Sequence, residues 1–196
     1  MSQRTWSSLV SLGALSLALG GFLLACGGQQ KPKEQLNAEM KGLPKWALGK
    51  CREGLKNKDA LCGSGSVQGM SNVSLARSAA EGRARTELAR TLQVRVKAML
   101  KDYQAATQGG PENQTAGEQH IEDVSKQITD MTLSGSRLED TFVNEETGTF
   151  WALVVLDPEA FKDSMKKMDG LDDKLRAHII QRADKAFHEL DDQTAP

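Results

Sequence analysis

The chain has 196 residues, a formal net charge of −1 at pH 7 and only 5% aromatic residues. Balanced basic and acidic residues exclude the broad basic surface of a nucleic-acid-binding protein. Sparse aromatic residues argue against a large aromatic binding cleft, and a chain of this length suits a single domain.

Residues 1–25 have the layout of a secretory signal peptide, with Arg4 as the only charge before an apolar stretch that ends in small residues. The stretch ends Leu-Leu-Ala-Cys-Gly at residues 23–27, which is a lipobox pattern. A thiolate is the nucleophile that can take a diacylglycerol thioether, and the freed amine can then take a further acyl chain such as palmitate. We therefore expect Cys26 to become the lipid-bearing first residue of the mature protein.

Two other interpretations of this N-terminus are an uncleaved transmembrane anchor and an ordinary secretory signal. The stretch is long enough to span a bilayer, since roughly 20 apolar residues suffice, but Ser11, Ser16 and Gly20-Gly21 interrupt it. Gly27 stands where an Asp would favour retention in the inner membrane of many Gram-negative bacteria. The expected location is thus the outer membrane, facing the periplasm or the cell surface.

Cys51 and Cys62 are the two cysteines that remain beside the lipidated one. An exported chain meets an oxidising compartment, so we expect them to form a disulfide. On the chain-entropy model this disulfide would stabilise the folded state by about 3 kcal/mol. The alternative is two free, buried thiols. Their spacing is not C-x-x-C and indicates neither a redox motif nor a zinc site.

Composition divides the mature chain into three parts. Residues 26–42 are polar, and we interpret them as a lipidated, flexible tether. Residues 43–190 form one domain, in which Trp46 is expected to cover an edge of the core, and residues 191–196 form a disordered tail.

The domain begins with a Gly-rich first strand over residues 62–70. Its glycine spacing differs from the dinucleotide-binding G-x-G-x-x-G, so we interpret the glycines as allowing close backbone packing. Ser71 is the expected N-cap of a long, Ala-rich helix over residues 72–107. Residues at steps of three and four predict its buried face, which comprises Leu75, Ala79, Leu88, Leu92, Val96, Met99 and Tyr103.

A second helix is expected over residues 116–131, followed by a hairpin with strands over 132–143 and 149–156. The latter strand is apolar on both faces and is therefore predicted to be central. Two more helices follow, over 158–168 and 172–190. This order predicts an α+β fold in which a small antiparallel sheet packs against the long helix, with further C-terminal helices.

The stretch from Pro44 to Leu156 resembles the LPP-twenty lipoprotein family, which comprises twenty-kilodalton outer-membrane lipoproteins and flagellum-associated relatives. The resemblance rests on Pro44-Lys45-Trp46, on Gly-Ser-Gly-Ser at 63–66, on the Ala/Arg/Leu helix at 76–89 and on the apolar strand ending at Asp157. It implies a structural or assembly role at the outer membrane and brings no established catalytic site. The Cys51–Cys62 pair and the last helix are not part of this pattern.

Residue types that carry catalysis or bind metals do not form a recognisable motif. His178 and His188 lie ten residues apart on one expected helix and cannot bind the same metal ion. We interpret these two histidines and His120 as surface residues. Ser64 and Ser66 are not in G-x-S-x-G, and adjacent Glu139 and Asp140 would face opposite sides of a strand. We expect no enzyme activity, cofactor or metal site.

The sequence therefore predicts a non-catalytic structural or interaction lipoprotein of the cell envelope. Its membrane contact is the lipid on Cys26, and its sheet edge or Ala-rich helix would bind an envelope protein or a second copy of the chain. One alternative is a small-ligand or lipid-binding module lined by Trp46, Phe142, Phe150 and Trp151. Another is an activator of an envelope enzyme such as a cell-wall synthase.

Overall fold

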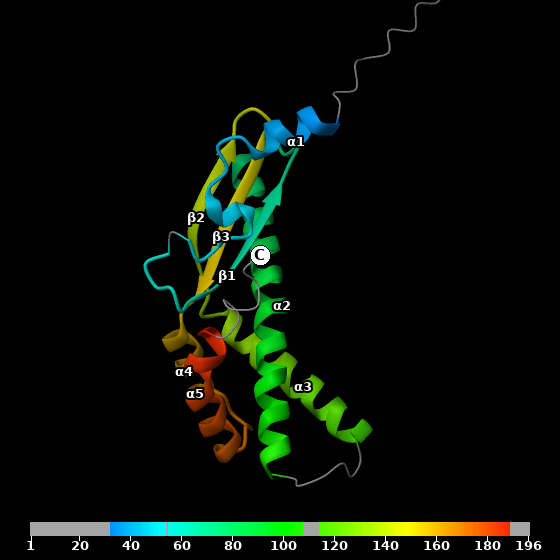
Figure 1. The fold of residues 1–196 in the computed structure, drawn as a ribbon, viewed down its shortest axis with the longest axis vertical. Coiled ribbons are helices and arrows are strands. Elements are labelled where there is room, and N and C mark those ends of the chain that lie inside the picture. The colour runs from blue at the N-terminus through cyan, green and yellow to red at the C-terminus, as the bar shows by residue number, and fades with distance from the viewer. Residues whose placement is uncertain (1–31, 54, 108–113, 189–196) are drawn as a thin grey trace, which may run out of the picture. The chain divides into compact units, whose positions relative to one another are not determined.

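The computed structural model describes residues 32–53, 55–107 and 114–188 (Figure 1). The chain divides into two units, residues 1–31 and 32–196, and every described residue belongs to the second. The expected signal peptide, the lipobox at Cys26 and the expected tail at 191–196 lie outside the described residues. The elements in chain order are α1 (Pro32–Met40), the 3-10 helix η1 (Lys45–Leu48), β1 (Leu61–Val67), α2 (Val73–Thr107), α3 (Gln114–Leu133), β2 (Arg137–Asn144), β3 (Thr149–Leu156), α4 (Pro158–Lys167) and α5 (Asp173–His188).

The three strands form one antiparallel sheet in the order β1-β3-β2. Leu61 pairs with Leu156 and Val67 with Phe150, so β1 crosses nearly the whole of β3. The apolar strand β3 is central, as its sequence predicts, and the long helix α2 packs against the sheet (Figure 1). The predicted α+β fold is confirmed.

Two glycines let α2 lie directly on the backbone of β1. A Cβ atom at Gly63 would lie 2.4 Å from the Ala84 carbonyl oxygen, and one at Gly65 would lie 2.4 Å from the Ala84 amide nitrogen. No side chain fits at such distances, so only glycine permits this approach. The interpretation of the glycines as close-packing residues is confirmed.

The buried face of α2 starts with alanines at positions 76, 80 and 84, and continues with Leu88 and further large apolar residues. Leu75 is 58% exposed and Ala79 is half-buried, so the predicted start of this face is wrong by one residue. The contact with the two glycines sets the rotation of the helix so that Ala84 faces β1. Positions four and eight residues earlier then face the sheet too, and small side chains there keep the helix close.

Two predicted boundaries are corrected by local hydrogen bonds. Asn72, rather than Ser71, caps α2, because its Oδ1 accepts a hydrogen bond of 3.0 Å from the Leu75 amide. Thr132 belongs to α3 and not to a strand, and its hydroxyl donates a hydrogen bond to the Ile128 carbonyl one turn earlier. The strand β2 accordingly begins at Arg137.

The second half of α2 packs against α3 and α5 rather than against the sheet. Phe161 of α4 and Phe187 of α5 are fully buried there, with ring centroids 5.1 Å apart in an edge-on arrangement. Ile179, Ala183 and Phe187 of α5 face the same core. Among the described helices, none has the length and apolar character needed to span a membrane.

A smaller apolar cluster covers the opposite face of the sheet. Trp46 of η1 is 6% exposed, which agrees with its expected place at an edge of the core. It packs with residues of β1, β3 and the loop between η1 and β1, namely Leu55, Ala60, Cys62, Leu153 and Val155.

Part of the segment predicted to be a flexible tether is helical. Residues 32–40 form α1, and the Asn144 side chain donates hydrogen bonds of 2.9 Å to the carbonyls of Ala38 and Glu39. The Thr149 hydroxyl donates to the Glu39 carboxylate, also at 2.9 Å. These bonds fix the last turn of α1 to the β2–β3 hairpin, so the expectation of a flexible tether is wrong for these residues.

The glycine contact predicts the effect of a single methyl group. Gly63→Ala forces α2 away from β1, and we expect the free energy of unfolding to fall by about 3 kcal/mol, at the upper end of the usual cost of overpacking. The measurement is urea denaturation monitored by circular dichroism.

Gly82→Ala is the matched control, because a Cβ atom there meets nothing within 4 Å on the exposed side of the same helix. It should leave stability unchanged or raise it by about 0.5–1 kcal/mol through helix propensity. Equal stabilities of the two variants would contradict the close contact.

Candidate interaction surfaces

The exposed edge of the sheet is β2. Its first half carries charges at Arg137, Glu139 and Asp140, together with a register shift between Leu138 and Asp140. Charges and bulges of this kind hinder pairing with another strand. The second half, Thr141–Val143, is uncharged, and the Val143 side chain is 47% exposed. By contrast, the other edge strand, β1, is largely buried.

The Ala-rich face of α2 is not available to a partner. Ala76 is 5% exposed, and Ala80 and Ala84 are fully buried against the sheet. Of the two surfaces predicted to bind a partner, the described structure therefore leaves the edge of β2.

Cys51 and Cys62 are joined by a disulfide, with their Cα atoms 6.0 Å apart. Cys62 lies in β1 and its side chain belongs to the smaller apolar cluster. The disulfide thus ties the loop after η1 to an edge strand of the sheet, and the predicted pairing is confirmed.

Two arginines hold the C-terminal end of α5. Arg52, next to the disulfide, donates a hydrogen bond to the Phe187 carbonyl, and Arg95 of α2 donates to the Ala186 carbonyl. The Arg95 guanidinium carbon also lies 5.8 Å from the centroid of the Phe187 ring. Cations at the last carbonyls of a helix stabilise its negative end. The disulfide loop and α2 are thereby both connected to α5.

Sequence reasoning missed Arg95, which is only 6% exposed. A signal was present, because Arg95 lies three residues after Leu92 and four before Met99, on the apolar side of the helix. A charged residue at such a position needs a buried partner, and the carbonyl at the end of α5 supplies one.

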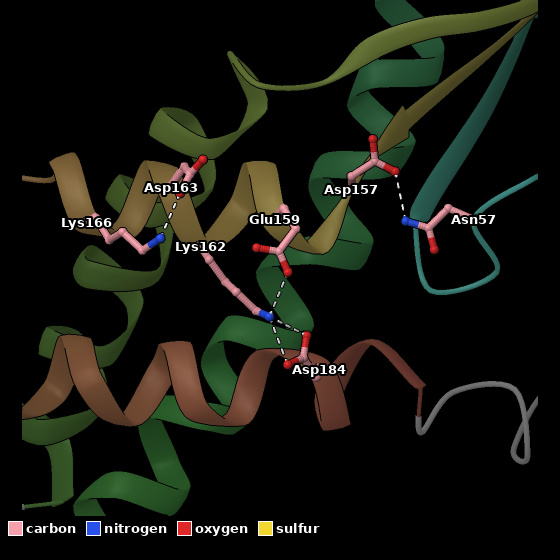
Figure 2. A network of polar contacts seen from close by, with 7 residues as sticks. All are labelled: Asn57, Asp157, Glu159, Lys162, Asp163, Lys166 and Asp184. Carbon is pink, nitrogen blue, oxygen red and sulfur yellow. Dashed lines mark hydrogen bonds and ion pairs between the residues drawn. The ribbon is translucent and has the colours of Figure 1, made fainter.

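A network of charged side chains joins α4 to α5 (Figure 2). The Lys162 ammonium lies 2.7 Å from Asp184 and 3.1 Å from Glu159, and its side chain is 15% exposed. The hydrogen bonds with Asp184 and then Glu159 raise the pKa of Lys162, against a smaller opposing effect of burial. Within α4, Lys166 pairs with Asp163 at 2.9 Å and lowers the pKa of that carboxyl group.

A second set of polar contacts lies where β3 ends. The Asp157 carboxylate accepts hydrogen bonds from Asn57, at 3.1 Å, and from Arg137 (Figure 2 shows the first). Asp140 accepts a hydrogen bond of 3.0 Å from the Trp46 indole, and Glu139 pairs with Arg137. The adjacent carboxylates at 139 and 140 thus have separate structural partners.

The histidines do not lie in one place. His120 is exposed on α3, while His178 of α5 is half-buried with its ring centroid 5.2 Å from that of Tyr103, so the surface assignment is wrong for His178. The side chain of His188 lies outside the described residues. Among the described residues, no three His, Cys, Asp or Glu side chains are grouped so that they could hold a metal ion. Ser64 and Ser66 are half-buried on β1.

One cavity of about 110 Å³ lies between α2, α3 and α5. Small-molecule sites have volumes of about 300–1,000 Å³, so this cavity is small for a ligand. The lining expected for a ligand site does not come together, because Phe150 packs on the α2 face while Trp46, Phe142 and Trp151 pack on the other. The cavity is lined by Leu100, Tyr103, Gln104, Thr107, His120, Ile121, Val124 and Leu175.

The raised pKa of Lys162 predicts a pH-dependent contribution to stability. This contribution is present below the unfolded-state pKa of about 10.4 and is lost as the pH rises through the higher folded-state pKa. Lys162→Gln should therefore lower the free energy of unfolding by about 1 kcal/mol or less at pH 7, because both carboxylate partners are exposed to solvent. The difference from the parent protein should shrink above pH 10, as measured by thermal unfolding.

Lys166→Gln is the control, since Lys166 pairs only within α4 and its side chain is 59% exposed. It should cost less than Lys162→Gln at pH 7. Equal losses in the two variants would show that the α4–α5 bridge carries no additional stability.

Comparison with known proteins gives one family. The model of the LPP20 lipoprotein family matches residues 44–157, which run from η1 through the end of β3 and make up more than half of the chain. The match includes Gly63, Gly65, the disulfide and the whole of α2, and it ends before α4. A search of curated proteins finds no match. The chain belongs to the LPP20 lipoprotein family, the family that its sequence resembles.

Proposed function

We propose that this protein is an outer-membrane lipoprotein that acts without catalysis, by binding another envelope protein or a second copy of itself. Membership of the LPP20 lipoprotein family is the observation that carries the proposal. The lipobox at residues 23–27 supports it independently, because it gives the chain an acceptor thiol at Cys26. Several acyl chains on one residue anchor a protein far more firmly than one chain does.

The edge of β2 is the proposed binding surface. An edge strand offers backbone N–H and C=O groups to an added strand, and pockets for alternate side chains give such pairing its specificity. Thr141 and Val143 are exposed and uncharged, whereas the preceding residues carry charges and a register shift. A partner strand would thus be directed to the half of β2 nearest the hairpin turn.

The polar side chains near this edge support a role in binding rather than in chemistry. Asp140 is engaged by Trp46, and Asp157 by Asn57 and Arg137. Each carboxylate serves to connect segments of the fold. A ligand-binding role has less support, since the described cavity is small and the four aromatic residues considered for a lining lie on opposite faces of the sheet.

Photo-crosslinking in whole cells tests the proposed surface. A photoreactive phenylalanine analogue in place of Val143 should give an adduct of higher mass in cells that make the lipidated protein. Thr141→Lys adds a charge to the edge, which opposes strand pairing, and should reduce that adduct at least about fivefold.

Gln127→Lys is the matched control, because it places the same charge on an exposed position of α3. It should leave the adduct unchanged. A protein that gives no adduct, or an adduct that Thr141→Lys and Gln127→Lys affect equally, would contradict a binding role for this edge.

Cell fractionation of Cys26→Ser tests the anchor separately: the parent protein should sediment with outer membranes and the variant should not.

A further inference from the structure

One end of the described domain brings together α1, the β2–β3 turn and the start of α2 (Figure 1). Lys41, just after α1, pairs with Glu146 of the turn at 2.9 Å. Gln68, which lies between β1 and α2, donates a hydrogen bond of 3.2 Å to the Thr147 carbonyl. Together with the Asn144 and Thr149 contacts to α1, these bonds hold the three segments at the hairpin end of the sheet.

Exposed large apolar side chains gather on the segments at this end. Val73 is 70% exposed and Leu36 58%, and apolar side chains that are exposed together mark protein or membrane interaction sites. The others described as exposed, Leu48, Val94 and Met131, lie apart on η1, α2 and α3. The set at the hairpin end comprises Leu36, Met40, Met70, Val73 and Leu75. Val143 is exposed as well, but it lies on the edge of β2 that is proposed above to bind a partner and is not counted in this set.

The length of chain before α1 indicates what this end meets. Only residues 27–31 separate Cys26 from Pro32, the first residue of α1. Six Cα–Cα steps extend at most about 20 Å, and a flexible chain of that length averages about 14 Å. In comparison, α2 alone has 35 residues and is about 52 Å long. A lipid on Cys26 therefore holds the α1 end close to the bilayer, at a distance much shorter than the length of α2.

We propose that the apolar set at the hairpin end inserts into the interfacial region of the bilayer that carries the Cys26 lipid. This inference rests on the proposed anchor. The short tether keeps the effective concentration of the membrane high, so even weak apolar insertion is well populated. Exposed Lys33 and Arg77 can extend their charged ends toward lipid phosphates while their stems remain near the apolar surface.

Charge alone does not account for this contact. Glu34 and Glu145 are exposed at the same end and offset the two basic residues. The driving force is thus burial of apolar side chains, which is less sensitive to salt than a polybasic contact would be. Insertion would fix the orientation of the domain on the membrane, which a lipid at a single residue does not do.

Depth measurements on the full lipidated protein test this orientation. In Val73→Cys the new cysteine is the only free thiol, because Cys26 bears lipid and the other two cysteines form a disulfide. An environment-sensitive fluorophore attached there, in vesicles of phosphatidylethanolamine and phosphatidylglycerol, should shift to shorter wavelength. Lipids with a nitroxide on the acyl chain should quench it several-fold more than the same label in Val94→Cys, about 30 Å further along the same helix.

A second pair of variants links the effect to the apolar set. Leu36→Glu should reduce quenching of the label at position 73, whereas Met131→Glu, on α3, should not. Equal quenching at positions 73 and 94 would overturn the inference. So would a label at 73 that is shielded in native outer membranes but unquenched in vesicles, because a protein would then cover this end.

The anchor has a separate readout in the same vesicles. If the parent protein floats with the vesicles and Cys26→Ser does not, the proposed anchor stands whatever the quenching shows. If neither floats, the anchor itself is wrong and the inference fails with it.

Discussion

The close approach of α2 to β1 determines how the rest of the domain is arranged. At Gly63 and Gly65 the helix lies against the strand with no side chain between them. This contact fixes the rotation of α2, and so places its alanines on the sheet and its larger apolar residues below it, where α3 and α5 pack. Because α2 reaches past the sheet, one helix supports both the strands and the C-terminal helices.

The C-terminal helices lie beyond the part of the chain that the family model matches, yet they are firmly connected to it. Arg95 of α2 and Arg52 of the disulfide loop both donate to carbonyls at the end of α5, and the Arg95 guanidinium lies over the Phe187 ring. Guanidinium groups that bind helix-end carbonyls combine hydrogen bonding with a favourable interaction with the helix dipole. The extension is thus an integral part of this domain's core rather than an appended segment.

The elements predicted well are those whose signals are local. Hydrophobic spacing predicts α2, and the apolar run of β3 predicts its central place in the sheet. The rotation of α2 depends on a contact with β1 that no local pattern contains, so the spacing predicts a buried Leu75 where the structure buries Ala76. The docking of α1 depends on Asn144 and Thr149, more than 100 residues away in the sequence. The sequence offers two candidate binding surfaces, the sheet edge and the Ala-rich face of α2. The structure excludes the second, because its alanines are buried against the sheet.

The fold therefore separates three tasks: the glycine contact organises the core, the edge of β2 is left accessible, and the α1 end lies nearest the expected lipid. The central claim is that β1 and the middle of α2 form one cooperative unit, and native-state hydrogen exchange tests it most directly. The amides of Ala84 and Leu88 should exchange only through global unfolding, with the same free energy as the β1 amides. Exchange of these helix amides at a clearly lower free energy than β1 would contradict the account.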